Sequence, residues 1–258
     1  MKKIHTSAIV HPEACIGNNV EIGPFSIIEK NVHIGDDCKI GSHVLIASGT
    51  SLASGCRVFK GAVLGTDPQD LKFGGEESRL EVGERVVIRE FATLNRGTKD
   101  KGVTKVGSDC LIMAYVHIAH DCEIGDRVIL ANAVNLAGHV VIEDDAGIGG
   151  MTPVHQFVHI GSHCFIGGGF RAHKDVPPFI LASGDPLGYA GLNSVGLRRK
   201  NFSSETRSLL KQVYKIIFRS GLNMNQALER VQGEFMQTKE VREVIQFIGK
   251  SQRGIIRS

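Results

Sequence analysis

Aliphatic side chains recur at every sixth position over most of this chain. The series runs from Ile4 to Ile166, and 25 of its 28 positions are Ile, Leu or Val. A period of six fits neither the 3.6-residue period of an amphipathic helix nor the alternation of an ordinary strand. It is typical of a parallel β-helix, in which each hexapeptide supplies one strand and one turn and three hexapeptides close a triangular coil. Residues separated by three hexapeptides should therefore stack on one another.

The series is interrupted at Asp70, Glu76 and Asp100, within the turn-rich segments 66–79 and 97–102. These segments are predicted to be loops inserted into the repeat. Long loops in compact folds tend to be functional, although a surface excursion or a contact between subunits is the alternative. Asp70 offers a hydrogen-bond acceptor and Lys72 a cation, which suit sugar hydroxyls and phosphate.

A second column of small or β-branched residues lies four positions after each aliphatic one. It contains five of the six cysteines, namely Cys38, Cys56, Cys110, Cys122 and Cys164. They are interpreted as small packing residues with free thiols. Glycine often follows the aliphatic position, as at Gly17 and Gly107. A corner that needs a positive φ would explain this preference.

The repeat is expected to end at Lys174–Phe179, because the two prolines of KDVPPF cannot donate to a strand ladder. Downstream, Ser203 opens an apolar pattern with helical spacing that stops near Gly221, and Asn223 and Thr238 are candidate caps of two more helices. We therefore expect a mainly β protein: a β-helix domain over residues 1–190 and a C-terminal helical domain over residues 191–258.

The formal net charge of +3 hides an asymmetry along the chain. The segment after Val195 carries 13 Lys and Arg against 5 Asp and Glu, so the C-terminal quarter is basic and should attract an anionic partner. The N-terminal residues lack the unbroken apolar stretch of an export signal. No apolar run approaches the length of about 18 residues that spans a membrane. We expect a cytoplasmic protein without an integral membrane segment.

Stacking by three hexapeptides places His120, Gly138 and Gln156 on one corner of successive coils. Three further histidines fall beside them in this register: His139, His155 and His173. A neutral imidazole can serve as a general base near pH 7, and Asp121 is placed to orient His120. Zinc binding by His117 and His120 is the weaker alternative, because the two occupy different positions of the repeat. A chance cluster of polar turn residues also remains open.

The resemblance to a known family rests on several strings spread over nearly the whole chain. They include GAVLGTDPQDLKFGGE, KVGSDCLIMAYVHIAHDCEIGD, IGGMTPVHQF and LNSVGLRRKNFS. With these strings the chain resembles the acyl-carrier-protein:UDP-N-acetylglucosamine O-acyltransferases of lipid A biosynthesis. The resemblance implies a left-handed β-helix, a homotrimer and no metal or redox cofactor. Its implied partners are a 3-hydroxyacyl carrier protein and UDP-N-acetylglucosamine, and not nucleic acid.

The resemblance also implies roles for individual residues. It makes His120 the general base, Asp121 its supporting carboxylate and Gly138 the oxyanion donor. Substrate contacts are implied for Gln69, Asp70, Lys72, His117, His139, His155, Gln156, Asn193 and Arg199. Gly168 would limit the acyl length, with Phe170 beside it, and Arg171, Arg198 and Lys200 would attract the acidic carrier protein.

Two positions depart from the family pattern. Val195 stands where members carry an acidic residue, and Lys200 where they carry a second arginine, whose bidentate geometry lysine cannot reproduce. Because these changes affect the nucleotide contacts, a UDP-sugar with a 3-amino group is an alternative acceptor. Two other functions are weighed: a zinc carbonic anhydrase on the same solenoid, and a non-catalytic solenoid that serves as a binding module.

Overall fold

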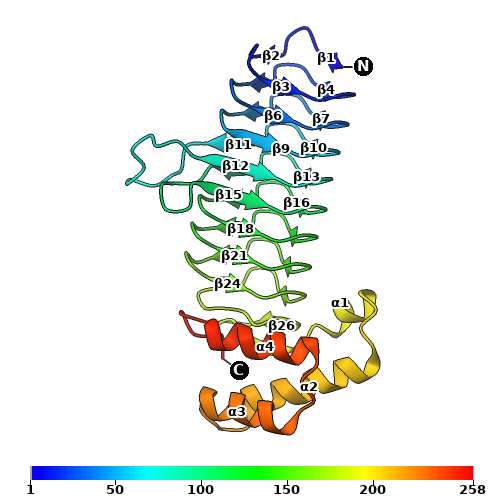
Figure 1. Cartoon of the computed structure of the whole chain (residues 1–258), viewed down its shortest axis with the longest axis vertical. Coiled ribbons are helices and arrows are strands. Elements are labelled where there is room, and N and C mark those ends of the chain that lie inside the picture. The colour runs from blue at the N-terminus through cyan, green and yellow to red at the C-terminus, as the bar shows by residue number, and fades with distance from the viewer. Residues whose placement is uncertain (1, 258) are drawn as a thin grey trace.

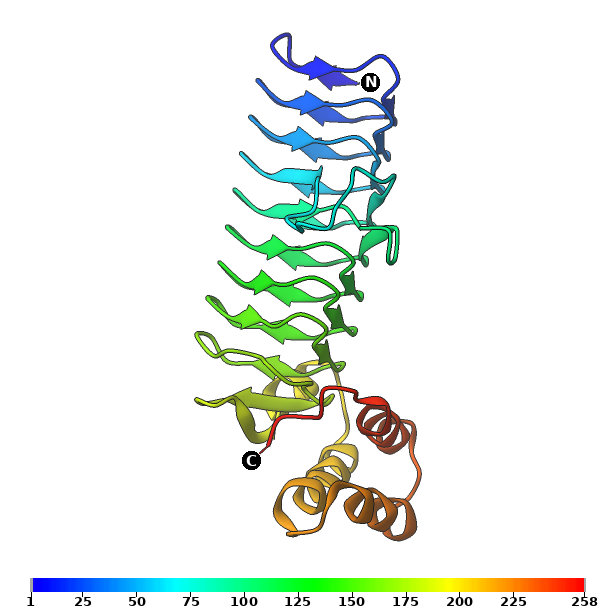
Figure 2. The same ribbon diagram turned by 90° about the vertical axis from the view of Figure 1, so that its left-hand side faces the viewer.

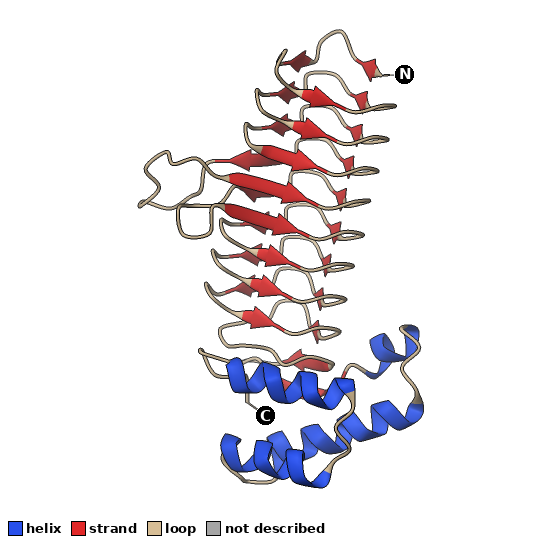
Figure 3. Cartoon of the chain, viewed as in Figure 1, coloured by secondary structure: helices blue, strands red, loops and turns tan. Residues whose placement is uncertain are grey.

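The computed structural model describes residues 2–257 and shows a three-sided solenoid that ends in a group of helices (Figures 1 and 3). Each coil gives one short strand to each of three parallel sheets, and the chain winds left-handed from the N-terminus toward the helices (Figure 1). The fold is therefore the left-handed parallel β-helix with C-terminal helices that was expected.

The three sheets contain the following strands. Sheet 1 consists of β1 (Lys3–Ile4), β4 (Glu21–Ile22), β7 (Lys39–Ile40), β10 (Arg57–Val58), β13 (Val87–Ile88), β16 (Leu111–Ile112), β19 (Ile129–Leu130), β22 (Gly147–Ile148), β25 (Phe165–Ile166), β26 (Ile180–Ser183) and β27 (Gly188–Leu192). Sheet 2 consists of β2 (Ile9–Val10), β5 (Ile27–Ile28), β8 (Leu45–Ile46), β11 (Val63–Thr66), β14 (Thr93–Asn95), β17 (His117–Ile118), β20 (Asn135–Leu136) and β23 (Pro153–Val154). Sheet 3 consists of β3 (Cys15–Ile16), β6 (His33–Ile34), β9 (Thr50–Leu52), β12 (Arg79–Val82), β15 (Val103–Val106), β18 (Glu123–Ile124), β21 (Val141–Ile142) and β24 (His159–Ile160).

The chain passes from sheet 1 to sheet 2 to sheet 3 in every coil, so the prism has three edges, which we call corners 1/2, 2/3 and 3/1. The predicted inward columns fill its interior. Ile118 and Ile112 are fully buried, and so are Cys38 and Cys56 of the small column. Burying one large aliphatic side chain contributes about 1.5–3 kcal/mol, so the repeated column is the main source of stability. All six cysteines are free thiols.

The interpretation of the glycines that follow the aliphatic residues holds for Gly65, with φ of +76°, but was wrong for most of the others. Gly17 and Gly107 do not have positive φ; that conformation falls two residues later, at Asn19 and Asp109. A β-carbon on Gly17 would lie 2.5 Å from Oδ1 of Asp36 in the next coil. Glycine is needed there because successive coils approach too closely for a side chain.

Both interruptions of the period are inserted loops, as predicted. Regular partners such as Ile112 and Leu130 are separated by three hexapeptides, whereas Leu64 pairs with Leu94, and Leu94 with Ile118, across longer stretches of chain. Residues 67–78 form insert 1 and residues 96–102 form insert 2. Both leave corner 2/3 and project from the same side of the solenoid (Figures 1 and 2).

Strand pairing does not end at KDVPPF. Phe165 pairs with Leu181 and Ile166 with Ala182, a separation two positions short of three hexapeptides, and β27 then adds an antiparallel strand. The prolines shift the register without ending the sheet. The expected domain boundary after residue 190 falls within β27.

Four helices follow the strands in the described chain: α1 (Ser194–Arg199), α2 (Ser204–Arg219), α3 (Met224–Glu234) and α4 (Lys239–Lys250). The predicted caps Ser203, Asn223 and Thr238 each accept a hydrogen bond from the first turn of their helix. The short helix α1 was not predicted. The C-terminal tail returns to the solenoid, where Asp175, 3% exposed, accepts a hydrogen bond from Oγ of Ser251.

Candidate active site

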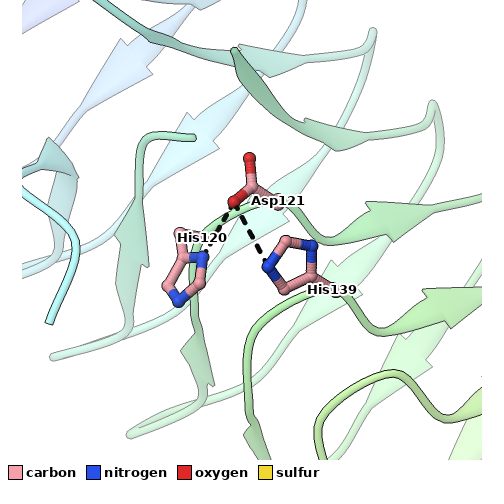
Figure 4. Close-up of side chains that lie close together, drawn as sticks. All are labelled: His120, Asp121 and His139. Carbon is pink, nitrogen blue, oxygen red and sulfur yellow. Dashed lines mark hydrogen bonds and ion pairs between the residues drawn. The ribbon is translucent and has the colours of Figure 1, made fainter. Parts of the chain in front are cut away.

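His120 and Asp121 form a buried pair in the turn that follows β17, at corner 2/3. Nδ1 of His120 lies 2.8 Å from Oδ2 of Asp121, and the two side chains are 9% and 0% exposed (Figure 4). Asp121 occupies the left-handed position of the turn, with φ of +60°. Nε2 of His120 has no hydrogen-bond partner within residues 2–257. This ring nitrogen is available to a substrate.

Asp121 is held by a residue of insert 2. Thr98 donates its backbone N–H to Oδ1 at 2.9 Å and its hydroxyl to Oδ2 at 2.6 Å. Burial alone raises the pKa of Asp121, but the hydrogen bonds from Thr98 and His120 outweigh it and bring the pKa below its ordinary value. Asp121 is therefore ionised at neutral pH.

Gly138 lies directly beside the imidazole of His120 in the next coil. A β-carbon at this position would be 2.5 Å from Cε1 and 2.7 Å from Nε2 of His120. Gly138 is buried, and its N–H donates no hydrogen bond to any part of residues 2–257. A buried, unpartnered N–H beside a free imidazole nitrogen can stabilise a negative charge that develops on a reacting oxygen.

His139 completes the corner from the following coil. Its ring meets that of His120 edge-on at 5.1 Å and stacks on Phe157 at 4.6 Å, and Nε2 lies 3.7 Å from Oδ2 of Asp121 (Figure 4). Burial lowers the pKa of His139, although the charge of Asp121 opposes this. His117, on β17, bonds through Nδ1 to Oγ1 of Thr93 at 2.7 Å, and burial lowers its pKa also.

The other histidines predicted for this corner are there, His155 two coils and His173 three coils further toward the helices. His155 and His173 border one depression together with Arg171, Lys174, Asp185, Pro186 and Arg253. Gln156 lies between His155 and Phe157 in the same turn. Nε of Arg253 is buried without a hydrogen-bond partner in the described chain. The surroundings of His155 are thus strongly cationic.

Insert 1 carries Gln69, Asp70 and Lys72 at the same corner. Gln69 and Lys72 are exposed, and Oδ1 of Asp70 accepts the N–H of Lys72 at 3.0 Å. Oε1 of Glu76 accepts the N–H of Lys99 at 3.0 Å, which joins insert 1 to insert 2. The two inserts are therefore joined to each other, and Thr98 of insert 2 contacts the His120–Asp121 pair.

The residues of α1 lie at a different corner of the prism. Nδ2 of Asn193 donates to the carbonyl of His163 at 2.9 Å, and Nζ of Lys200 lies 2.5 Å from Oδ1 of Asp145; both partners belong to corner 3/1. Arg198 and Arg199 are exposed on the same helix. Within one chain, the structure does not bring Asn193 or Arg199 to His120, and Lys200 is occupied by an ion pair. Figure 1 shows α1 on the side opposite the inserts.

Gly168 lies at the third edge, corner 1/2, in the turn after β25. A β-carbon there would be 3.0 Å from the carbonyl oxygen of Gly150, and Phe170 packs against the core beside it. The residue predicted to limit the acyl length is therefore not in contact with the His120 corner within one chain.

His120, Asp121 and His139 also offer ligand atoms within 4.8 Å of one another, as a metal site would. However, both oxygens of Asp121 accept hydrogen bonds from Thr98, and Oδ2 also accepts one from His120. His117, the other proposed zinc ligand, is bonded to Thr93. This arrangement favours a hydrogen-bonded acid–base pair over metal ligation.

Sequence reasoning missed Thr98. The hexad phase cannot place it, since it lies in an insert that breaks the phase. Its only signal is its position in a short polar loop that precedes the return of the repeat.

The solenoid and its histidine corner define a hexapeptide-repeat transferase. Residues 16–48 and 104–138 match the model of the bacterial transferase hexapeptide, and residues 175–256 match that of domain 2 of UDP-N-acetylglucosamine O-acyltransferase. The chain is 45% identical over 258 residues to the acyl-[acyl-carrier-protein]–UDP-N-acetylglucosamine O-acyltransferase of Thiobacillus denitrificans, with 100% of both chains covered. It belongs to the acyl-[acyl-carrier-protein]–UDP-N-acetylglucosamine O-acyltransferase family.

Other relatives agree with this assignment. The Chlorobaculum tepidum enzyme of the same name is 52% identical over 248 residues, which are 96% of this chain and 94% of that one. Among solved structures, the UDP-N-acetylglucosamine acyltransferase of Bacteroides fragilis superposes with a TM-score of 0.96 at 45% identity, covering 98% and 99% of the two chains. That of Francisella novicida gives 0.96 at 40% identity, covering 99% and 94%. Among residues 2–257, no helix combines the length and apolar character that a membrane crossing requires.

Proposed function

We propose that this protein transfers a 3-hydroxyacyl group from acyl carrier protein to the 3-position of UDP-N-acetylglucosamine, the first step of lipid A biosynthesis. The observation that carries the proposal is the free Nε2 of His120, backed by an ionised Asp121 and placed beside the unpartnered N–H of Gly138. Membership of the family supports the reaction, and the geometry of this corner is consistent with the roles proposed for His120, Asp121 and Gly138.

In the proposed reaction, Nε2 of His120 takes the proton of the sugar 3-hydroxyl as its oxygen attacks the thioester carbon. The thioester oxygen becomes an oxyanion, which the N–H of Gly138 stabilises; loss of such a donor in other enzymes costs about 2.7–4 kcal/mol. The intermediate then expels the pantetheine sulfur, which receives the proton from His120. Asp121 stabilises the protonated imidazole between the two steps. The residues of this chain perform each proton transfer.

The remaining contacts are proposals that follow the family. We assign His117, His139, His155, Gln156, Gln69, Asp70 and Lys72 to the sugar and to the pantetheine-linked acyl group. All of them lie at corner 2/3 or on the adjoining strand β17. We assign Asn193 and Arg199 to the nucleotide, and Gly168 to the limit on acyl length.

We further propose that three copies assemble with corner 1/2 at the centre. Four large apolar side chains protrude along that edge, Phe25, Phe91, Tyr115 and Met151, which are 60%, 46%, 61% and 74% exposed. Phe91 and Tyr115 stack on each other at 5.4 Å, and exposed apolar side chains gathered in this way are typical of an interaction site. With these edges on a common axis, corner 2/3 of one copy lies next to corner 3/1 of the next. A homotrimer would thus unite His120 with the Asn193 and Arg199 of a neighbouring copy.

The acidic carrier protein is proposed to approach from the helical end. Arg171 lines the cationic depression that contains His155, and Arg198 is exposed on α1. Helix α2 adds Lys211, Lys215 and Arg219, spaced by four positions on one exposed face. On this basis residues 1–190 supply the chemistry, and residues 191–258 supply an excess of positive charge, with 13 Lys and Arg against 5 Asp and Glu. Lys200 contributes less directly, since it is paired with Asp145.

The cysteines and the two departures from the family pattern bear on the compartment and on the acceptor. The six free cysteines fit a reducing compartment, which supports a cytoplasmic location. Val195 is 50% exposed and Lys200 is held by Asp145, so the nucleotide contacts of this chain differ from those of an acidic residue and an arginine. This difference keeps a 3-amino UDP-sugar as the alternative acceptor.

The test is mass spectrometry of the products formed by the purified protein from a panel of 3-hydroxyacyl carrier proteins, with UDP-N-acetylglucosamine and with its 3-amino analogue. We expect one acylated UDP-sugar and a His120→Ala variant that is at least about 100-fold slower. Lack of any acylated product with both acceptors would contradict the proposal. Full activity of the folded His120→Ala variant would remove the assignment of the base.

A further inference from the structure

Insert 2 places one threonine against the carboxylate that supports His120. Thr98 is 5% exposed, and both of its hydrogen-bond donors point at Asp121, the N–H at 2.9 Å and the hydroxyl at 2.6 Å. No other residue of insert 2 contacts Asp121 by a hydrogen bond within residues 2–257. Thr98 is therefore the link between the insert and the reacting groups.

The direction of the hydroxyl proton follows from its other partner. Oγ1 of Thr98 accepts the N–H of Asp100 at 3.3 Å. A threonine hydroxyl has one proton to donate, and here that proton faces Oδ2 of Asp121. Both oxygens of Asp121 thus face donors, in a site from which water is excluded, since the side chain is 0% exposed. This environment stabilises the carboxylate over the carboxylic acid.

An ionised Asp121 determines which nitrogen of His120 carries the proton. Nδ1 lies 2.8 Å from an oxygen that can only accept, so Nδ1 must be the protonated nitrogen of the neutral ring. Nε2 then presents its lone pair beside Gly138. With the opposite tautomer, Nδ1 and the carboxylate would repel each other and no base would face the substrate.

We propose that Thr98 is a positioning residue for acyl transfer, which holds Asp121 as an acceptor and so fixes the tautomer of His120 that leaves Nε2 free. This inference rests on the proposed function for its kinetic consequence, but not for its structural one. It gives insert 2 a specific task. Through the bond from the N–H of Lys99 to Glu76, it also ties insert 1, with Asp70 and Lys72, to the same carboxylate.

The kinetic test compares three variants with the wild-type protein. Thr98→Val keeps the shape and the backbone N–H but removes the hydroxyl, and we expect kcat to fall about 10- to 100-fold with little change in KM. Thr98→Ser restores the hydroxyl and should return kcat close to the wild-type value. Thr50→Val is the matched control: Thr50 is fully buried, its hydroxyl has no partner in the described chain, and its loss should leave kcat unchanged.

A second measurement is independent of any substrate. ¹⁵N NMR of histidine-labelled protein, assigned with His120→Ala, reports the tautomer of His120 directly. We expect protonated Nδ1 in the wild-type protein and in Thr98→Ser, and a mixture of tautomers in Thr98→Val. Should Thr98→Val melt far below the wild-type protein, Thr98→Ala removes the same hydroxyl without adding apolar volume.

Each result of these measurements either supports or overturns the proposed role of Thr98. A protonated Nε2 in wild-type His120 overturns the inference, and so does a Thr98→Val variant with unchanged kcat and unchanged tautomer. Failure of serine to restore kcat also overturns it, because the hydroxyl would then not be the group that matters. If the wild-type protein acylates neither acceptor, the proposed function fails, while the NMR result still decides what Thr98 does to His120.

Discussion

At the scale of single residues, Gly138 packs directly against the imidazole of His120. The imidazole occupies the space that a side chain at position 138 would fill, with 2.5 Å between Cε1 and a β-carbon placed there. Gly138 does not have a positive φ, so its backbone conformation is open to any residue. Glycine is needed here for space alone.

Gly138→Ala should therefore displace the imidazole of His120 without unfolding the coil. We expect kcat/KM to fall at least about 100-fold, because the base and the oxyanion donor lose their alignment together. Steady-state kinetics and thermal melting measure the two effects. Gly233→Ala, in α3 with open space around its α-carbon, is the matched control and should keep full activity. Equal loss of activity in both variants would contradict this account of Gly138.

The buried histidines make stability depend on pH. Burial lowers the pKa of His117, His139 and His163 below the ordinary value of about 6.5. Between the lowered pKa and about 6.5, the unfolded chain binds more protons than the folded chain. The free energy of unfolding should therefore fall as the pH drops below about 6.5, and urea titrations at pH 7.5 and 5.5 would measure this.

His163→Gln isolates one contribution to that dependence. The His163 ring stacks on Phe179 and meets Phe202 edge-on, away from corner 2/3, so the substitution leaves the candidate site in place. The variant should be less stable than the wild-type protein at pH 7.5 but lose less stability on acidification. A fall as large as that of the wild-type protein would show that His163 does not contribute.

The residues of the site differ in how far the sequence could predict them. His120, Gly138 and His139 follow from the six-residue phase, because uninterrupted coils make stacking a matter of counting. Thr98 could not be placed in this way, since the conformation of insert 2 depends on contacts with Asp121 and Glu76 that no periodic rule encodes.

At the scale of elements, strong local signals gave reliable predictions and weak ones did not. Capping residues marked the starts of α2, α3 and α4. The short helix α1 has too few residues to show a period, and tertiary contacts hold it: Asn193 to His163, and Lys200 to Asp145. The extension of sheet 1 through β26 was missed because it follows a two-residue shift of register.

Lys200→Met tests whether the attachment of α1 matters for nucleotide binding. The variant removes the ion pair with Asp145, which keeps Arg127 as a partner at 2.9 Å. A partly exposed pair is worth about 1 kcal/mol or less, so KM for the UDP-sugar should rise about two- to fivefold with kcat unchanged. Lys250→Met, at the exposed end of α4, is the control. An unchanged KM in Lys200→Met would show that α1 is held well enough by Asn193.

At the scale of the whole molecule, the three edges of the prism have separate characters. Corner 2/3 carries the histidines, corner 3/1 carries the contacts of α1, and corner 1/2 carries exposed apolar residues. A single chain cannot bring corner 2/3 and corner 3/1 together. The proposed trimer would bring them together, so activity would require assembly.

Met151→Glu should therefore abolish activity by preventing assembly. Met151 is 74% exposed on corner 1/2, and three glutamates near a common axis would repel one another. Sedimentation at micromolar concentration should show a trimer of 27.9 kDa chains for the wild-type protein and monomers for the variant. Gln232→Glu, on the exposed side of α3, should remain trimeric and active. An active monomeric Met151→Glu variant would contradict the proposal.

The translational symmetry of the coils has a consequence for the length of the molecule. Because each coil contacts only its two neighbours, the segment from Asn18 to Gly35, which spans three hexapeptides, is a removable unit. Its loss would bring β3 against β9 with every inward side chain still inward. Excision of one residue more or one fewer would instead point the aliphatic side chains of the remaining N-terminal strands toward solvent. The length of the solenoid can thus change by whole coils without a change in the candidate active site, which lies nearer the helices.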